Sequence, residues 1–244
     1  SNPTAGVKMS LIDKIEKPLF IVNPESNERR ALKKWKQVEY SLGNYVDYDI
    51  LYTTTKKETI DSIKKDRIHR KIIAVGGDGT VNAVLEGLLQ SDSEKILGII
   101  PAGIANDISR TFNICSNLNE FYNILLNENI KETDVGEVNG NYFLGYASLG
   151  FDAATLEERN KRRFLKGKLA YFTGALRALF SYTSKKMKIK INKKKYFDKN
   201  IFLMVISNIK HYASGMEMAP DAKPDDGLLN LRMIEGESNL GTIL

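Results

Sequence analysis

The stretch Lys71–Leu89, KIIAVGGDGTVNAVLEGLL, decides the fold of this chain. It begins with four consecutive apolar residues, Ile72–Val75, a run typical of a strand buried on both faces. The glycine-rich string Gly76–Asn82 follows at once, and apolar side chains then recur at helical spacing at Val81, Val84, Leu85, Leu88 and Leu89. A buried strand that turns through glycines into an amphipathic helix is the repeating unit of a parallel α/β sheet.

The same alternation extends outward from this stretch. Apolar runs predict further strands at residues 18–23, 48–52 and 96–100, and helical periodicity predicts helices at 28–42, 57–65 and after Asn117. In the first of these helices, Leu32, Trp35, Val38 and Leu42 recur at helical spacing and mark the expected apolar face. We therefore expect a parallel sheet with helices on both faces, and a ligand at the carboxyl ends of its strands.

From about residue 130 the pattern changes. Strand-like segments at 130–149, 186–206 and 228–234 are joined by turns such as Asn139-Gly140-Asn141, and one helix is expected over 165–182. We therefore expect two domains, an α/β domain in residues 1–130 and an antiparallel β domain in residues 131–244, with a cleft between them.

Composition restricts the class of protein. No apolar run approaches the ~20 residues that cross a bilayer, and the first residues lack the apolar core of a secretory signal. Cys115 is the single cysteine, which excludes an intramolecular disulfide and a zinc cluster built on cysteines. These features favour a cytoplasmic protein.

The net charge of +6 conceals a basic band. Between Arg159 and Lys199 there are 15 basic residues and one acid, Asp198, so the rest of the chain is acidic overall. Such a band suits a nucleic acid backbone or an anionic membrane, and it could equally be a solvated face that confers solubility. The strict alternation of Lys186–Ile191 predicts a strand with its lysines on one exposed face.

The string Gly76–Asn82 carries the chemistry. Glycines let the backbone approach a ligand closely, and the N–H groups at the start of a helix bind anions. Asp78 inside this loop would repel a phosphate unless a cation bridges them, so it predicts Mg²⁺ binding or proton transfer. The alternative is a plain turn capped by Asp78 and Thr80. The string matches neither a Walker A loop nor a dinucleotide-binding G-x-G-x-x-G.

Six blocks, in order, resemble the diacylglycerol kinase catalytic domain family, which includes bacterial soluble diacylglycerol kinases, YegS-like lipid kinases and sphingosine kinases. The family patterns G-G-D-G-T-x-N-E-V-x-x-G-L and P-x-G-T-x-N-D-F-x-R appear at residues 76–88 and 101–110. The other blocks lie at residues 23–27, 150–153, 167–171 and 219–228.

This resemblance implies an N-terminal NAD-kinase-like, Rossmann-like α/β domain and a C-terminal antiparallel β-sandwich-like domain. It implies transfer of the ATP γ-phosphoryl group to the hydroxyl of a lipid such as diacylglycerol, with Mg²⁺. Asp78 is the expected catalytic residue of this chain, and the family's general-base glutamate is expected beyond Leu244. The expected ATP-binding residues are Asn23, Pro24, Glu25, Ser26, Asn27, Thr54, Gly76, Gly77, Asp78, Gly79, Thr80, Val81, Asn82, Asn106 and Asp107.

Asp152 matches a position near the lipid headgroup, or it caps a helix. Asp226 with the carbonyls of Lys223 and Leu228 matches a structural Mg²⁺ site, or the segment is a simple turn. The expected partners are the lipid substrate and an anionic membrane surface that the enzyme contacts peripherally. No nucleic acid partner is expected; the oligomeric state stays open, and a homodimer is one possibility.

Three positions depart from the family pattern: Asn27 replaces glycine, Ala83 replaces glutamate and Ile104 replaces threonine. Glu235-Gly236-Glu237 resembles the family's D-G-E motif but falls too early to be assigned as the base. Two alternatives therefore stay open: a non-catalytic relative that binds nucleotide or lipid, and a kinase that phosphorylates NAD.

Overall fold

The structure is a computed structural model, and it describes residues 16–26, 29–43, 46–114, 130–152, 155, 182–192 and 195–236, the side chains of 195–197 excepted. The chain divides into two compact units. Unit 1 comprises Ser1–Leu144 and His211–Met216, and unit 2 comprises Gly145–Lys210 and Glu217–Leu244.

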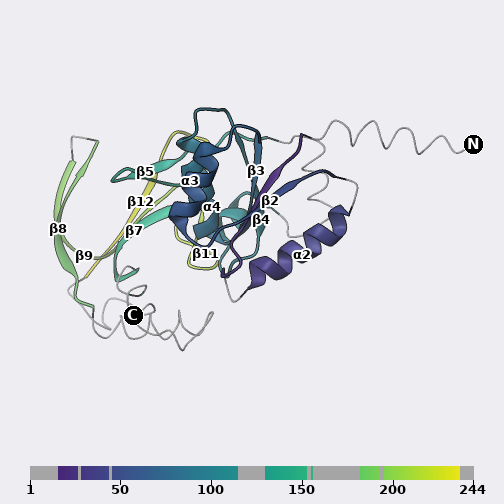
Figure 1. Ribbon diagram of the computed structural model, residues 1–244. Helices are drawn as coiled ribbons and strands as arrows, with labels where there is room; N and C mark the ends of the chain where they lie inside the picture. The colour runs from purple at the N-terminus through teal and green to yellow at the C-terminus, as the bar shows by residue number, and fades with distance from the viewer. Residues whose placement is uncertain are drawn as a thin grey trace, which may run out of the picture. The chain divides into compact units, whose positions relative to one another are not determined.

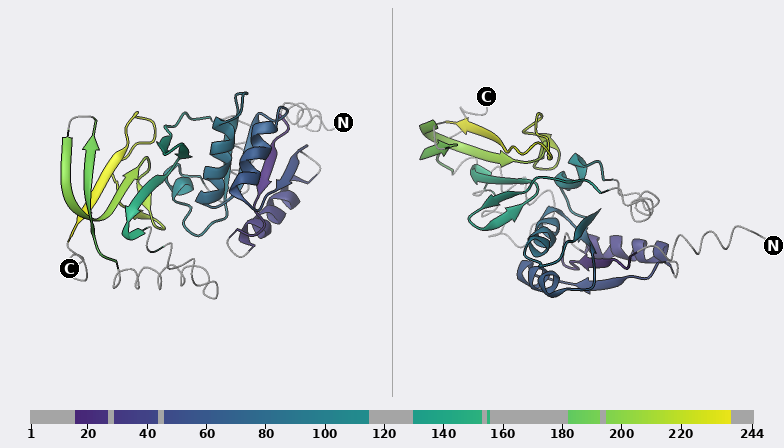
Figure 2. Two further views of the ribbon diagram at one scale, coloured as in Figure 1. Left: turned by 60° about the vertical axis from the view of Figure 1, so that its left-hand side comes forward. Right: turned by 90° about the horizontal axis from the view of Figure 1, so that it is seen from above.

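Unit 1 is built on a parallel sheet of four strands in the order β2-β1-β3-β4. The strands are β1 (Leu19–Val22), β2 (Asp49–Tyr52), β3 (Lys71–Gly76) and β4 (Ile96–Pro101). The connecting helices are α2 (Arg30–Leu42), α3 (Lys56–Lys65) and α4 (Asp78–Leu89). Because parallel crossovers are right-handed, α2 covers one face of the sheet, and α3 and α4 cover the other (Figures 1 and 2). The predicted α/β arrangement is confirmed.

The apolar stripe of α2 forms one core of unit 1. Trp35, Val38 and Leu42 pack on Phe20, Val22, Ile73, Val75 and Ile100 of the sheet. The rings of Phe20 and Trp35 lie 4.8 Å apart, a favourable tilted aromatic contact. The helical spacing of these side chains in the sequence therefore predicted the buried face of α2.

Several shorter elements complete unit 1: α5 (Asp107–Thr111), β5 (Gly136–Val138), β6 (Asn141–Phe143), and β10 (His211–Tyr212), which pairs with β11 (Met216–Glu217). β5 and β6 form a hairpin whose turn residues Asn139 and Gly140 have φ values of 51° and 76°. This two-residue turn is the one that the Asn-Gly pair predicted. The helix expected after Asn117 lies outside the described residues.

Unit 2 contains an antiparallel sheet centred on β9 (Lys195–Ser207). The end of β9 pairs with β7 (Tyr146–Gly150) and β12 (Asn230–Glu235), and its beginning pairs with β8 (Lys185–Ile191) (Figure 1). The predicted antiparallel second domain is confirmed. Of the helix expected over 165–182, only Tyr182 is described.

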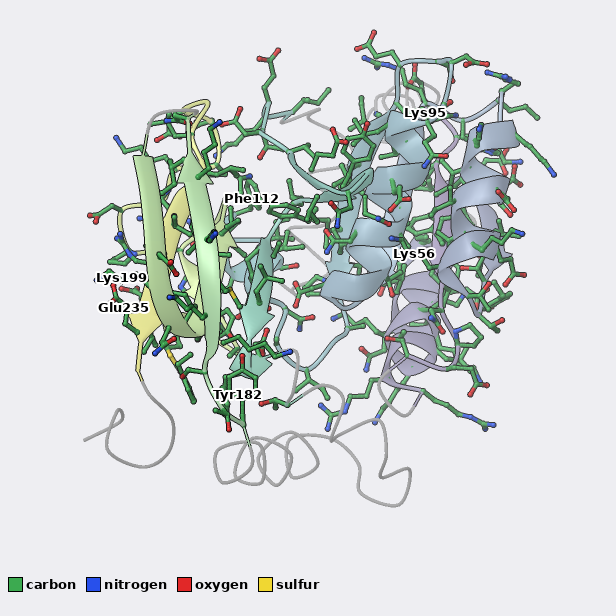
Figure 3. The ribbon with its side chains drawn as sticks, turned by 90° about the vertical axis from the view of Figure 1, so that its left-hand side faces the viewer. Lys56, Lys95, Phe112, Tyr182, Lys199 and Glu235 are labelled. Atoms are coloured by element: carbon green, nitrogen blue, oxygen red, sulfur yellow. The ribbon has the colours of Figure 1, made fainter. Side chains whose placement is uncertain are left out.

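The lysines of β8 lie as the alternation predicted. Lys186, Lys188 and Lys190 are exposed, whereas Met187 and Ile189 between them are half-buried. A long-range pair, Lys199 Nζ with Glu235 Oε2 at 2.9 Å, links β9 to β12 (Figure 3).

A network of charges lies at the amino ends of the strands of unit 1. His69 Nδ1 is 2.6 Å from Asp66 Oδ2, and His69 Nε2 is 2.8 Å from Asp49 Oδ2. The Lys95 ammonium, 1% exposed, donates to Asp66 Oδ1 at 3.0 Å (Figure 3). Burial by itself raises the pKa of the Asp66 carboxyl, but the hydrogen bonds from His69 and Lys95 outweigh burial and lower this pKa from 3.8 to about 2.

This network makes the stability of unit 1 sensitive to acid. A carboxyl whose pKa is lower in the folded chain stabilises the fold above its unfolded pKa, and this contribution is lost as the pH falls from about 4 to about 2. Between about pH 4 and about pH 2 we expect the unfolding free energy of wild type to fall by on the order of 2 kcal/mol more than that of Asp66→Asn. Urea unfolding at each pH measures both. Asp92→Asn is the control, because Asp92 is 79% exposed in its pair with Arg67 and should change the pH profile little. Parallel pH profiles for wild type and Asp66→Asn would contradict the prediction.

Candidate active site

The loops expected to bind nucleotide gather at one edge of unit 1. All four strands run in the same direction, so the turns that follow them meet at the carboxyl edge of the sheet. β1 and β3 are neighbours, and their chains leave toward α2 and α4 on opposite faces. Such a point of divergence is where open α/β sheets bind ligands.

Two glycines from different loops touch at this edge. A Cβ on Gly103 would lie 2.5 Å from the Gly77 Cα, so neither loop could approach as closely with a side chain there. Ala102 N–H donates to Gly76 O at 2.8 Å and continues the strand pairing into the turns. The loop after β3 and the loop after β4 therefore form one packed unit.

Asn106 closes the second of these loops. Its backbone is left-handed, with φ 51°. Its Oδ1 accepts from Gly103 N–H at 2.8 Å, and its Nδ2 donates to Gly103 O at 3.2 Å. The asparagine thus fixes both polar groups of the residue that touches Gly77.

Asp78 joins the two loops from the other side. Its carboxylate accepts from the backbone N–H of Asp107 at 3.3 Å and of Ile108 at 3.1 Å, at the start of α5. Burial raises the pKa of Asp78, and the nearby Asp107 carboxylate adds to this effect. The side chain expected to bind Mg²⁺ or move a proton is therefore also the link that holds α5 against the glycine turn.

Asp107 lies behind this contact and is 1% exposed. Its Oδ2 accepts from Ser214 N–H at 3.0 Å, and its Oδ1 has no hydrogen-bond partner among the described residues. The His211 Nδ1 atom lies 3.0 Å from Thr111 Oγ1, one turn further along α5. Sequence reasoning missed Ser214 and His211, because no motif marks them and they lie about a hundred residues from α5.

Asn82 contacts the segment that follows the β5–β6 hairpin. Its Oδ1 accepts from Leu144 N–H at 3.1 Å, which ties α4 to the end of the β5–β6 hairpin. Ala83, where the family pattern has glutamate, is buried in α4. A carboxylate occurs one turn later instead: Glu86 pairs with Lys56 Nζ at 2.7 Å (Figure 3).

The remaining expected nucleotide residues form turns at the same edge. Asn23 Oδ1 accepts from Glu25 N–H at 3.0 Å, and Ser26 N–H donates to Asn23 O at 3.1 Å. Thr54 N–H donates to Glu58 Oε2 at 2.8 Å just before α3. The carboxyl edge of the sheet is thus surrounded by residues 23–26, 54, 76–82 and 106–107. Asn27, the remaining expected residue, lies outside the described residues.

In unit 2, Asp152 is buried directly after β7 and accepts a hydrogen bond from Ser148 Oγ. Beside it, the rings of Phe151 and Phe202 stack at 4.8 Å, and Tyr182 meets Phe202 edge-on at 5.6 Å (Figure 3). The Tyr182 hydroxyl is buried and has no hydrogen-bond partner in the part of the chain that the structure describes, and burial raises its pKa. Asp152 therefore sits at the border of an aromatic cluster.

Asp226 lies in an exposed turn of unit 2. Its Oδ1 accepts from Leu228 N–H at 3.0 Å, and Gly227 between them has φ 73°. A carboxylate with the carbonyls of Lys223 and Leu228 is an all-oxygen donor set, which suits Mg²⁺.

Over the described parts of the chain, no group of three or more His, Cys, Asp or Glu side chains is arranged so that it could hold a metal ion. No helix among those same residues is both long and apolar enough to cross a membrane.

Two family models match the chain. The diacylglycerol kinase catalytic domain matches residues 17–138, and the YegS C-terminal NAD kinase beta sandwich-like domain matches residues 145–243. The chain therefore belongs to the diacylglycerol kinase catalytic domain family, and it is a lipid kinase of that family.

Relatives agree with this assignment. The diacylglycerol kinase of Bacillus subtilis (strain 168) is 28% identical over 236 residues, which cover 92% of this chain and 75% of that protein. That of Staphylococcus haemolyticus (strain JCSC1435) is 26% identical over 234 residues, covering 92% and 68%. The crystal structure of a diacylglycerol kinase from Bacillus anthracis str. Sterne is similar with a TM-score of 0.66 at 27% identity, covering 91% of this chain and 74% of that one.

Proposed function

We propose that this lipid kinase transfers the γ-phosphoryl group of ATP to the hydroxyl of diacylglycerol. The observation that carries the proposal is the contact of Gly77 with Gly103, which packs two glycine turns together at the carboxyl edge of the sheet. The names of the relatives support diacylglycerol as the acceptor.

Phosphoryl transfer needs positioning and charge neutralisation more than covalent chemistry from the protein. The first turn of α4 supplies N–H groups and the positive end of a helix dipole beside exposed Gly79. Asp78 and Asn106 hold the two turns in one geometry, so that the phosphate groups meet a preformed site.

We propose ATP as the phosphoryl donor and Mg²⁺ as the metal ion. Bound Mg²⁺ would neutralise phosphate charge during transfer. The Asp226 turn suits a structural ion, because its carboxylate and the carbonyls of Lys223 and Leu228 are hard oxygen donors. We place the lipid headgroup beside Asp152, where the buried carboxylate and the aromatic cluster combine polar and apolar contacts.

We also propose that the lysine face of β8 holds the enzyme on an anionic membrane. Each lysine near an anionic surface contributes about 1 kcal/mol, so replacing Lys185, Lys186, Lys188 and Lys190 by glutamate should weaken binding to phosphatidylserine vesicles at least ~100-fold. Vesicle cosedimentation measures this loss. The matched control reverses four exposed lysines of unit 1: Lys33, Lys36, Lys64 and Lys65. Equal losses in both variants would mean that net charge, and not this face, governs binding.

A panel of acceptors tests the chemistry. The chain and a form extended past Leu244, where the general-base glutamate is expected, are incubated with labelled ATP, Mg²⁺ and micelles that contain diacylglycerol, phosphatidylglycerol, a sphingoid base or undecaprenol, and separately with NAD. We expect label on diacylglycerol at least tenfold above the others. Label on another lipid would show that this lipid, and not diacylglycerol, is the substrate. Label on NAD would show that the chain is a NAD kinase.

A further inference from the structure

A segment from late in the chain belongs to the glycine-loop unit. Residues His211–Met216, here called the strap, cluster with unit 1, although the chain on both sides of them belongs to unit 2. Nothing in the local sequence of the strap requires this position, so the contacts that hold it there need an explanation.

The strap is held along α5. Ser214 N–H donates to Asp107 Oδ2 at 3.0 Å, and His211 Nδ1 lies 3.0 Å from Thr111 Oγ1. Gly215 faces the Arg110 guanidinium so closely that a Cβ would lie 3.2 Å from its Nε. Three residues of a five-residue helix are thus in contact with the strap.

The backbone of the strap is strained. Ala213 and Ser214 have φ values of 48° and 78°, in the left-handed region that residues with a side chain disfavour. Such conformations persist only where surrounding contacts enforce them, and they concentrate at functional sites. The contacts with α5 provide that enforcement.

These contacts lead to the glycine turn in two steps. The Asp107 carboxylate accepts from the strap, and the Asp107 backbone N–H donates to the Asp78 carboxylate. Asp78 is the first residue of α4 and belongs to the turn that touches Gly103. The strap is therefore connected to the glycine turns through the two hydrogen bonds of Asp107.

We propose that the strap is a positioning element of the nucleotide site and that Thr111 and His211 are its positioning residues. The proposal rests on the proposed function, in which the glycine turns hold ATP. Coupling between two sites is reciprocal, so nucleotide should order the strap as much as the strap strengthens nucleotide binding.

Amide hydrogen exchange of the purified chain with and without ADP tests this coupling. In wild type, ADP should slow exchange of the Ser214 amide roughly tenfold. Thr111→Val removes the hydroxyl at nearly constant shape; it should abolish most of this slowing and raise KM for ATP about fivefold with kcat nearly unchanged. Thr111→Ser keeps the hydroxyl and should behave as wild type.

The Leu144 amide is the internal control, because it is held by Asn82 and not by the strap. Its exchange should be the same in Thr111→Val as in wild type. His211→Phe removes the other partner of the Thr111 contact, and it should likewise abolish most of the slowing of Ser214 exchange by ADP. ADP binding with unchanged Ser214 exchange would overturn the strap proposal alone, and absence of ADP binding in wild type would overturn the nucleotide site and the strap proposal together.

Discussion

Replacing Asp78 by asparagine should lower the rate of phosphoryl transfer roughly 100-fold or more while the chain still folds. The Asp78 carboxylate uses both oxygens to accept the N–H groups of Asp107 and Ile108. Asparagine keeps one acceptor and places an amide donor against the other N–H, so α5 must shift. A misplacement of about 1 Å near a reacting group can cost ~10²-fold in rate.

Two measurements separate this effect from unfolding. The unfolding free energy of Asp78→Asn should fall by only about 1 kcal/mol, the usual value of a helix-capping carboxylate. Asp61→Asn on the exposed face of α3 is the control and should leave both quantities unchanged. Since burial raises the pKa of Asp78, the wild-type rate should also fall on the acid side at a higher pH than an ordinary aspartate would give. Near-normal turnover in Asp78→Asn would remove this residue from the mechanism.

Gly103→Ala should have the largest effect on stability. The added Cβ would meet the Gly77 Cα at 2.5 Å and the Asn106 Oδ1 at 2.7 Å. Backbone on one side and a doubly hydrogen-bonded side chain on the other cannot move aside easily. Overpacking of this kind costs about 1–3 kcal/mol, and the separated turns should also bind ADP at least tenfold more weakly.

Gly79→Ala is the matched control for this substitution. It adds the same methyl group in the same site, but beyond its own helical turn no atom of the described residues lies within 4 Å of the new Cβ. Alanine also favours a helix over glycine, so its unfolding free energy should be equal to wild type or higher. Urea unfolding of both variants provides the comparison, and ADP titration of Gly103→Ala against wild type measures the weaker binding. Equal stability of the two variants would mean that the Gly77–Gly103 contact does not hold the turns together.

Features that depend on local periodicity could be predicted from the sequence. The buried strand at Ile72–Val75, the core face of α2 with Trp35 and Val38, and the exposed lysines of β8 all lie as expected. In each of these, the burial of a residue follows from its spacing within a single helix or strand, and that spacing is written in the sequence.

Features that depend on contacts between segments distant in the sequence could not be predicted from it. The pairing of Gly77 with Gly103, the hydrogen bonds from α5 to Asp78 and the strap at Ser214 each join segments that are distant in sequence. A motif marked Asp78 as chemically important, but its carboxylate could be seen to hold α5 only after both loops were placed.

The measurement that tests the account most directly is transfer of label from γ-labelled ATP to diacylglycerol, with Mg²⁺ in mixed micelles, by this chain and by a form extended past Leu244, where the general-base glutamate is expected. The account predicts that the extended form makes labelled phosphatidic acid in proportion to enzyme and that Asp78→Asn in this form abolishes the label. An extended form that binds ADP but leaves every lipid unlabelled would contradict the proposed kinase and favour a relative that binds nucleotide without transferring phosphate.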